Sequence, residues 1–227
     1  VTEMIHKAEK GEFKSLYIIG ENPLVSDPDL NHAEKGFKNL EFLVVQDIFL
    51  TETAQLADVV LPSFCFAEKD GTFSNTERRV QLVRKAVEAP GFAREDWKII
   101  CEIATKMGSR MHYNSAKEIF EEIRRLTPSY AGITWERLEN GGIHWPCPTV
   151  DHPGTPILHT TNFTRGKGLF HAIDHQPPAE LPDAEYPFLL TTGRVLYHYH
   201  TGSMTMKSDW LNEMSPECFV EISPNDA

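Results

Sequence analysis

The amino-acid sequence predicts an α/β fold built on a parallel β-sheet. Three apolar runs without polar alternation, over residues 16–19, 43–45 and 59–61, are the first observation. Runs of this kind are typical of strands that are covered on both faces, as in a parallel sheet. The second observation is that helical signals separate the runs. The rhythm of strand, polar residues and helix indicates right-handed βαβ crossovers.

A polar cluster follows each apolar run. The clusters are Gly20-Glu21-Asn22-Pro23, Gln46-Asp47 and Pro62-Ser63. Ligands of open α/β sheets bind beyond the carboxyl ends of the strands, where all three clusters are expected. We therefore expect the clusters to form one wall of a nucleotide-like pocket.

Start and stop signals define the elements of the first part of the chain. Pro23 fixes its own φ and disfavours helical geometry at Asn22, which predicts a turn. Ser and Asp are preferred helix caps, and Pro is favoured in a first turn. The expected elements are a helix within 1–13 that ends at Gly11, a strand over 16–19, a helix over 28–37 capped by Ser26 or Asp27, a strand over 40–45, a short helix from Thr51 or Thr53 to Ala57, and a strand over 58–61.

After Ser63 the pattern changes. Alternating polar and apolar residues predict a hairpin that turns near Ser74–Asn75. Two amphipathic helices are expected over 94–108, ended by Gly108, and over 115–126, where Ser115 and Glu118 have the spacing of a capping box. Eight prolines between positions 146 and 187 predict a long irregular connector, and two strands are expected after it, over 186–193 and 217–222.

Composition excludes some classes of function. The chain has 227 residues, is 41% hydrophobic and carries a formal net charge of −11, which argues against a general nucleic-acid or anionic-membrane binder. No apolar run has the length of a membrane span, and the first residues lack the apolar core of a signal peptide. We expect a cytoplasmic location without nucleic-acid binding or membrane insertion.

The cysteines and the chain ends carry further information. Cys65, Cys101, Cys147 and Cys218 lie at spacings that match no zinc or iron–sulfur motif, which favours free cysteines in a reducing compartment. The first residue is not Met, and the last residues stop at a helix N-cap signal with no helix after it. We expect the chain to be a fragment of a longer one.

Several polar residues are candidates for ligand contacts, and each also has a structural interpretation. Asp47 can accept the paired N–H donors of guanine or bind a ribose hydroxyl, and Gln46 beside it can both donate and accept. Asn22 can bind a sugar or phosphate where Gly20 allows close approach of the backbone. On the residues alone, capping and turn formation are the favoured interpretations of Asp47 and Asn22.

The remaining candidates follow the same logic. Ser63 can bind a phosphate or cap the next segment, and Asp96 in a first helical turn offsets the helix dipole. Lys69, Arg78 and Arg79 can neutralise a pyrophosphate, although a solvated hairpin face is the default interpretation. Arg194 is a candidate anion contact. His198 and His200 have the spacing of neighbouring metal ligands on a strand, but no third ligand is apparent, so we name no metal ligand.

No catalytic motif is present. The chain has no GxGxxG fingerprint, no phosphate loop, and no recognisable pair of nucleophile and base. From the residues alone, we therefore predict a soluble α/β fragment that binds a nucleotide-like group and carries no catalytic residue.

The ordered motifs resemble those of the catalytic subunit of molybdopterin-dependent oxidoreductases. The stretches that carry the resemblance are IIGENPLVSDPDL, FLVVQDIFLTETAQLADVVLPS, AEKDGTFSNTERRVQ, EDWKIICEIATKMG and YPFLLTTGRVLYHYHTGSMT. They cover nearly the whole chain and are most similar to formate dehydrogenases. The alternatives are a nitrate reductase relative and a non-catalytic scaffold similar to the large iron–sulfur subunit of respiratory complex I.

The resemblance implies a cofactor and a role for each candidate residue. Such subunits hold molybdenum or tungsten through two molybdopterin guanine dinucleotides (bis-MGD) and pass electrons to a 4Fe–4S cluster. Asp96 is implied to meet guanine, and Gln46-Asp47 the ribose or base. Arg194 and His198 are implied to begin a β-barrel that clamps the pterins. The cofactor-binding positions implied together are Gly20, Asn22, Ser26, Gln46, Asp47, Ser63, Asp96, Arg194 and His198.

The resemblance also implies a division into four parts. These are a Rossmann-like guanosine-binding portion over 1–64, a hairpin with helices over 65–145, a connector over 146–182, and the start of the dinucleotide-binding β-barrel over 183–227. The family's cluster-binding cysteines and its metal-binding Cys or selenocysteine are absent from the sequence. We therefore expect partners: the remainder of the catalytic subunit, iron–sulfur electron-transfer subunits, and formate or carbon dioxide as substrate.

Overall fold

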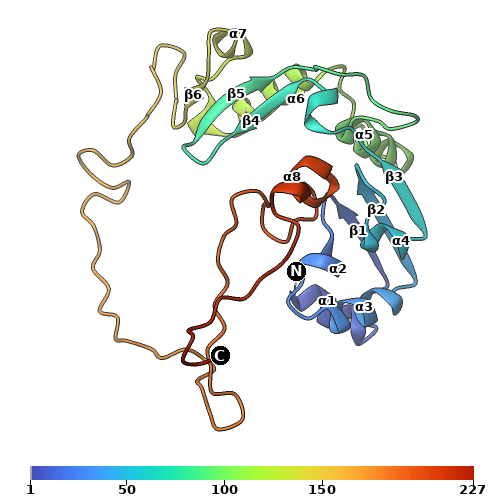
Figure 1. Ribbon diagram of the computed structural model, residues 1–227. Coiled ribbons are helices and arrows are strands. Elements are labelled where there is room, and N and C mark those ends of the chain that lie inside the picture. The colour runs from blue at the N-terminus through green and yellow to red at the C-terminus, as the bar shows by residue number, and fades with distance from the viewer. Residues whose placement is uncertain (1) are drawn as a thin grey trace.

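A parallel sheet of three strands forms the first part of the structure, a computed structural model that describes residues 2–227. The strands are β1 (Ser15–Ile19), β2 (Phe42–Asp47) and β3 (Val59–Pro62), and their spatial order is the same as their order along the chain (Figure 1). The register pairs Ile19 with Gln46 and Asp47 with Pro62. The predicted parallel sheet is confirmed, with strand bounds that differ by one or two residues.

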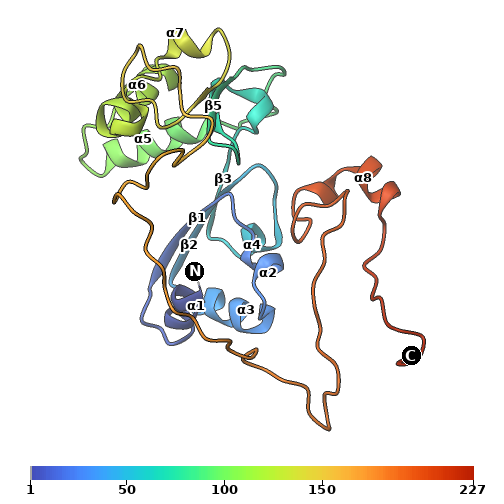
Figure 2. The same ribbon diagram turned by 90° about the vertical axis from the view of Figure 1, so that its left-hand side faces the viewer.

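Four helices accompany this sheet. They are α1 (Thr2–Glu9), α2 (Pro23–Ser26), α3 (Leu30–Lys38) and α4 (Glu52–Gln55). Figure 2 shows α1 and α3 side by side against the sheet. The core between helices and sheet contains the buried residues Ile5, Ala33, Phe37, Leu43, Val45 and Ala54.

The expectation that both faces of the strands are covered is wrong for the described residues. Side chains that alternate with the core positions remain partly exposed: Tyr17 is 40% exposed, Ile19 42% and Phe42 46%. Because successive side chains of a strand point to opposite faces, these residues mark the second face of the sheet. The described residues leave these three positions of that face partly uncovered.

A second sheet is antiparallel and has the order β4-β5-β6. Strands β4 (Gly71–Ser74) and β5 (Arg79–Val83) form the predicted hairpin, which turns through residues 75–78, and β6 (Ile143–His144) pairs with β5. Helices α5 (Asp96–Lys106), α6 (Ala116–Leu126) and α7 (Trp135–Leu138) accompany it, with short 3-10 turns at Phe66–Glu68 and Pro128–Tyr130. Its core contains Val80, Phe120, Ile133, Leu138, Ile143 and Cys147.

Two predicted helix starts need correction. The helix expected over 28–37 is capped by Asp29, whose Oδ1 accepts a hydrogen bond from the amide of His32 at 3.0 Å. The turn expected at Pro23 is instead the first turn of α2, because proline is well tolerated at a helix start. Ser115 caps α6 as predicted, through a bond from Glu118 N at 3.3 Å, but the Glu118 carboxylate accepts from Asn114 N and not from Ser115 N.

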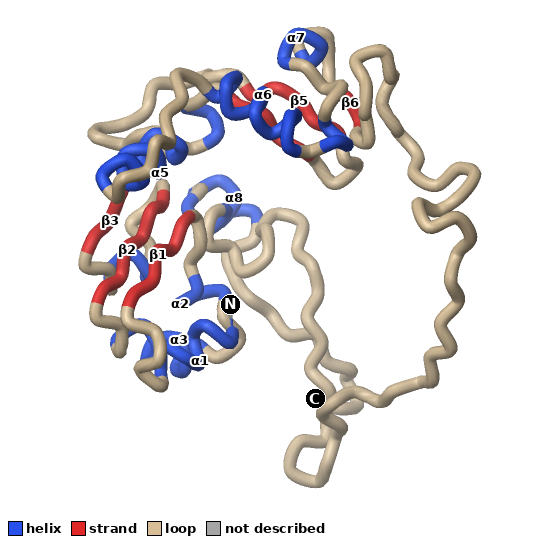
Figure 3. The backbone as a smooth tube through the Cα atoms, turned by 180° about the vertical axis from the view of Figure 1, so that it is seen from behind, coloured by secondary structure: helices blue, strands red, loops and turns tan. Residues whose placement is uncertain are grey.

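The C-terminal part contains little regular structure. Between β6 and a 3-10 turn at Thr205–Lys207, the described chain has no helix or strand, and Figure 3 shows it as a long loop. Helix α8 (Asp209–Met214) follows and lies on the side of the sheet where α2 and α4 lie (Figures 1 and 2). None of the described helices is both long and apolar enough to cross a membrane.

The strands predicted over 186–193 and 217–222 are wrong for this structure. Neither stretch forms a strand or pairs with one, and the side chains of Phe188, Leu190 and Val220 are 59%, 84% and 76% exposed. An isolated strand is not stable in water, because its backbone needs hydrogen-bond partners and its apolar face needs cover. The described residues offer neither to these two stretches.

Candidate functional site

The carboxyl ends of the three parallel strands bring the predicted polar clusters together. The amide of Gly20 donates a hydrogen bond to Gln46 O at 2.9 Å, and the amide of Ser63 donates to Asp47 O at 3.1 Å. Gly20 has φ +63 with open space around its Cα, a conformation that favours glycine. We call this region, with Asp96 and Lys69 beside it, the sheet edge.

Gln46 is the buried centre of the sheet edge, with none of its surface exposed. Its Nε2 donates a hydrogen bond to Asp96 Oδ1 at 2.8 Å, and its Oε1 accepts one from the Tyr17 hydroxyl. The other carboxylate oxygen of Asp96 forms an ion pair with Lys69 Nζ. Lys69 also donates to Phe64 O at 3.2 Å. Four side chains from β1, β2, the loop after β3 and α5 thus form one hydrogen-bonded chain.

This chain of bonds fixes the charge of Asp96. Burial acts to raise the pKa of Asp96, but hydrogen bonds from Lys69 and Gln46 and the positive charge of Lys69 outweigh it and lower the pKa below its usual value. Burial, and next the nearby charge of Asp96, raise the pKa of Tyr17. At neutral pH, Asp96 is therefore a carboxylate and Tyr17 a neutral phenol.

A cavity of about 220 Å³ opens beside Asp96. Lys69, Gly71, Asp96 and Trp97 are among its lining residues. The indole Nε1 of Trp97 is buried and has no hydrogen-bond partner among the described residues. Typical small-molecule sites measure about 300–1,000 Å³, so this cavity suits one part of a larger ligand.

Asn22 and Ser26 lie at the same edge but serve the local structure. Asn22 is buried, its Nδ2 donates to Glu52 Oε2 at 2.8 Å, and its Oδ1 accepts from Thr53 Oγ1 at 2.8 Å and Thr53 N at 3.2 Å. The exposed Ser26 donates through its hydroxyl to Asn22 O at 3.2 Å. The bond from Asn22, before all other causes, lowers the pKa of Glu52, and the charge of Lys207 adds to it.

The side chains of Asp47 and Ser63 differ in their hydrogen bonds to the protein. Oδ1 of Asp47 accepts bonds from the amides of Ile48 at 2.7 Å and Phe49 at 3.2 Å, so the carboxylate orders the loop after β2. Ser63 is held through its backbone, in a parallel bridge with Arg94, and its hydroxyl makes no hydrogen bond to another described residue. The hydroxyl of this buried residue thus has no protein partner among the described residues.

The structure does not bring Arg194 and His198 to the sheet edge through any described hydrogen bond or ion pair. Arg194 is exposed in the extended C-terminal segment. The ring of His198 contacts Thr205 Oγ1 at 3.2 Å and Ser215 O at 2.8 Å, so it links the 3-10 turn before α8 to the residue that follows α8.

Arg78 and Arg79 do not join Lys69 in a phosphate site. Arg78 donates to the carbonyl oxygens of Thr155 and Pro156, each at 3.0 Å, and also to that of Trp145. Arg79 forms an ion pair with Glu77 at 2.9 Å. Each of the three basic residues has a separate protein partner, which favours the structural interpretation over a shared pyrophosphate site.

Sequence reasoning missed several members of the sheet edge. Tyr17 was hidden within an apolar run, and Lys69 was grouped with the hairpin arginines instead of with Asp96. The only available signal was alternation along the strands: Tyr17 and Gln46 fall on the same face when β1 and β2 pair in parallel register. All four cysteines are free, as predicted.

The chain belongs to the molybdopterin oxidoreductase family. Residues 1–106 match the family model "Molybdopterin oxidoreductase", and residues 188–227 match the model "Molydopterin dinucleotide binding domain". The fold is an α/β arrangement of a parallel and an antiparallel sheet. The two matched models indicate a family that uses a molybdopterin dinucleotide cofactor.

Named relatives align with the chain over nearly its whole length. It is 57% identical to the alpha subunit of the F420-dependent formate dehydrogenase of Methanocaldococcus jannaschii, over 100% of this chain and 34% of that protein. It is 43% identical to the catalytic subunit of the assimilatory nitrate reductase of Bacillus subtilis, over 99% of this chain and 33% of that protein. The chain therefore spans about a third of the length of these relatives.

A solved structure resembles part of the fold. Acetylene hydratase from Pelobacter acetylenicus superimposes with a TM-score of 0.50 and 26% sequence identity. The likeness covers 61% of this chain and 20% of the hydratase chain.

Proposed function

We propose that this chain is the segment of a formate dehydrogenase catalytic subunit that binds one guanosine end of a molybdopterin guanine dinucleotide. The observation that carries the proposal is the hydrogen-bonded chain Gln46–Asp96–Lys69 at the carboxyl ends of the parallel strands. The family match supports a dinucleotide cofactor, and the 57% identical relative supports formate as the substrate class.

The hydrogen-bond acceptors of Asp96 fit the N–H donors of guanine. An ionised carboxylate offers about four lone-pair sites on its two oxygens, and Gln46 and Lys69 use one on each oxygen of Asp96. One further acceptor site on each oxygen matches the N1–H and N2–H₂ donors of guanine, which are spaced for paired hydrogen bonds. The lowered pKa of Asp96 keeps the carboxylate an acceptor at neutral pH.

The other candidate residues would complete the contact with the guanosine. Gly20 leaves space beside the backbone for a ribose, and the free hydroxyl of Ser63 can donate to a phosphate or sugar oxygen. Asp47 presents its remaining lone pairs at the same edge, and Asn22 has one amide N–H left to donate, while Ser26 supports the backbone of Asn22. These residues bind and orient the dinucleotide.

The cofactor supplies the redox chemistry in this proposal: formate loses two electrons and one proton to give carbon dioxide. The residues of this chain hold the guanosine and so determine where the rest of the cofactor lies. The proposal includes two such dinucleotides holding molybdenum or tungsten, a 4Fe–4S cluster bound elsewhere in the subunit, and iron–sulfur partner subunits in the cytoplasm.

The C-terminal residues have a proposed role of their own. We place the start of the dinucleotide-binding β-barrel at residues 183–227, with Arg194 and His198 at its beginning, and the connector over 146–182 before it. The match of residues 188–227 to a dinucleotide-binding model supports this assignment. The exposed apolar side chains over 186–193 and 217–222 have the composition of barrel strands that need partners from further residues.

A nitrate reductase is the second candidate, favoured by the 43% identical relative. The third alternative, a scaffold subunit without molybdenum, has no need for an ionised Asp96 held beside Gln46 of β2. The full-length subunit that contains this sequence, purified without oxygen, separates the three. We expect molybdenum or tungsten together with formate-dependent dye reduction. Nitrate reduction without formate oxidation supports the second candidate, and absence of both metals contradicts the proposal.

A further inference from the structure

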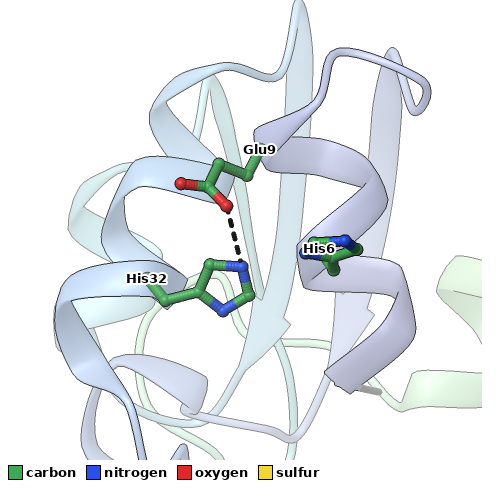
Figure 4. A group of neighbouring side chains, drawn as sticks. All are labelled: His6, Glu9 and His32. Carbon is green, nitrogen blue, oxygen red and sulfur yellow. Dashed lines mark ion pairs between the residues drawn. The ribbon is translucent and has the colours of Figure 1, made fainter.

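Helices α1 and α3 bring together three side chains that bind metals in other proteins, and these are His6, Glu9 and His32 (Figure 4). His6 and Glu9 are three residues apart on α1 and therefore share one face of that helix. His32 comes from the first turn of α3. One ligand atom from each of the three side chains lies within 4.8 Å of the other two.

The two helices are fixed close to each other. A Cβ at Gly36 of α3 would lie 2.9 Å from Ile5 O and 3.1 Å from Ile5 Cγ2, so only glycine allows this approach. Asn39 Nδ2, at the end of α3, donates to Glu9 O at 2.7 Å. The three side chains thus project from rigid, packed elements, as ligand sets require.

The ring of His32 has a buried nitrogen without a hydrogen-bond partner among the described residues. Its Nε2 lies 3.1 Å from Glu9 Oε2, but the geometry is not that of a hydrogen bond, and this buried atom has no hydrogen-bond partner among the described residues. The ring of His6 stands beside it, with centroids 5.8 Å apart. A buried polar atom without a partner is costly, and a bound cation between the three groups would satisfy it.

The distances suit a tetrahedral metal ion. Ligand atoms at 2.0–2.1 Å from zinc lie about 3.4 Å apart in a tetrahedron. The 3.1 Å separation of Glu9 and His32 is close to this value. His6 is exposed, so rotation of its side chain can close the remaining distance. Two imidazoles and one carboxylate favour zinc, nickel or copper over magnesium, which prefers oxygen ligands.

We propose that His6, Glu9 and His32 bind one divalent transition-metal ion of the zinc class, with the fourth position left to water. The metal joins α1 to α3 on the helical layer of the parallel sheet. It lies outside the sheet edge, and the site needs no residue from it. It is independent of the function proposed above.

Zinc binding to the full-length subunit tests this site. After removal of loosely held metal with a chelator, zinc is titrated against a chromophoric competitor, and bound zinc is counted by mass spectrometry. We expect the wild-type protein to hold one more zinc ion than His6→Ala or Glu9→Gln. Each substitution should lower the affinity of this site for zinc at least about tenfold. Magnesium should not compete.

His171→Ala is the matched control, because His171 is exposed in the connector and belongs to no such cluster. It should bind zinc as the wild-type does. His6→Ala removes an exposed side chain and leaves the core intact, so its effect reports on metal binding. Zinc should also raise the thermal unfolding midpoint of the wild-type but not of His6→Ala. Equal zinc content and affinity in all variants overturns the proposal and leaves only a close contact between Glu9 and His32.

Discussion

Gln46 Nε2 donates a hydrogen bond to Asp96 Oδ1 at 2.8 Å, although fifty residues separate them along the chain. Gln46 is the next-to-last residue of β2 in the parallel sheet, and Asp96 begins α5, which accompanies the antiparallel sheet. The bond therefore joins the two halves of the fold at the sheet edge. Both residues are tied to further side chains, Gln46 to Tyr17 and Asp96 to Lys69, so a change at either one acts on the whole group.

Replacing Gln46 with Leu should destabilise the protein. The substitution leaves Asp96 Oδ1 and the Tyr17 hydroxyl without their buried partner, which costs about 1–3 kcal/mol. Thermal unfolding of the full-length subunit, followed by circular dichroism, measures the effect. Gln55→Leu is the control because Gln55 is exposed at the end of α4. If both variants melt together, the contacts of Gln46 do not stabilise the fold.

Replacing Lys69 with Met should change how stability depends on pH. Asp96 has a lowered pKa in the folded state, so it contributes stability above its unfolded pKa of about 3.9 that is lost as the pH falls through its folded pKa. Without Lys69, the main cause of the lowering is gone and burial raises the pKa. The stability gap between wild-type and variant should be widest near neutral pH and close under acid conditions.

Unfolding midpoints from pH 7 down to pH 3 measure this dependence. Lys10→Met is the control, since Lys10 is exposed and has no ion pair with another described residue. Parallel curves for wild-type and Lys69→Met would show that Lys69 does not set the charge of Asp96.

Replacing Gly36 with Ala should loosen the packing of α1 on α3. The new Cβ would lie 2.9 Å from the backbone oxygen of Ile5, and a backbone atom cannot move aside cheaply. Overpacking of this kind costs about 1–3 kcal/mol. Gly193→Ala, which meets no atom within 4 Å, should leave the unfolding midpoint unchanged. An unchanged midpoint for Gly36→Ala would show that the two helices can move apart.

Replacing Arg78 with Gln should release the start of the connector. The guanidinium holds the carbonyl oxygens of Trp145, Thr155 and Pro156, and a shorter amide cannot reach all of them. Backbone amides over 145–156 should exchange hydrogen faster in the variant, while those of the parallel sheet keep their rates. Arg110→Gln, at an exposed position, serves as the control. Unchanged exchange over 145–156 would mean that other contacts hold this segment.

The parallel sheet could be predicted because its signals are local. Each strand is a short apolar run that ends in polar residues, and those ends must meet when the strands pair in parallel. The position of Asp96 could not be predicted in this way. It lies beside Gln46 because Ser63 and Arg94, which are 31 residues apart, form a bridge, and no periodicity in the sequence predicts such a bridge.

The C-terminal strands were predicted from composition and are absent for a physical reason. Phe188, Leu190 and Val220 belong to sequences that favour strands, yet propensity alone does not pair a strand.

The proposed metal ligand set could not be predicted from the sequence because its two parts lie on different helices. His6 and Glu9 alone resemble an ordinary solvated helix face, and only the packing of α1 on α3 adds His32.

The most direct test of the guanosine site is the guanine nucleotide content of full-length Asp96→Ala. Acid hydrolysis of the purified protein releases the nucleotide of the cofactor, which chromatography counts per subunit. We predict that Asp96→Ala loses most of this nucleotide, and that Asp151→Ala, an exposed control, keeps it. Asp96→Asn keeps the shape of the side chain but not its charge, and it should lose nucleotide as well. Wild-type nucleotide content in folded Asp96→Ala and Asp96→Asn would contradict the account.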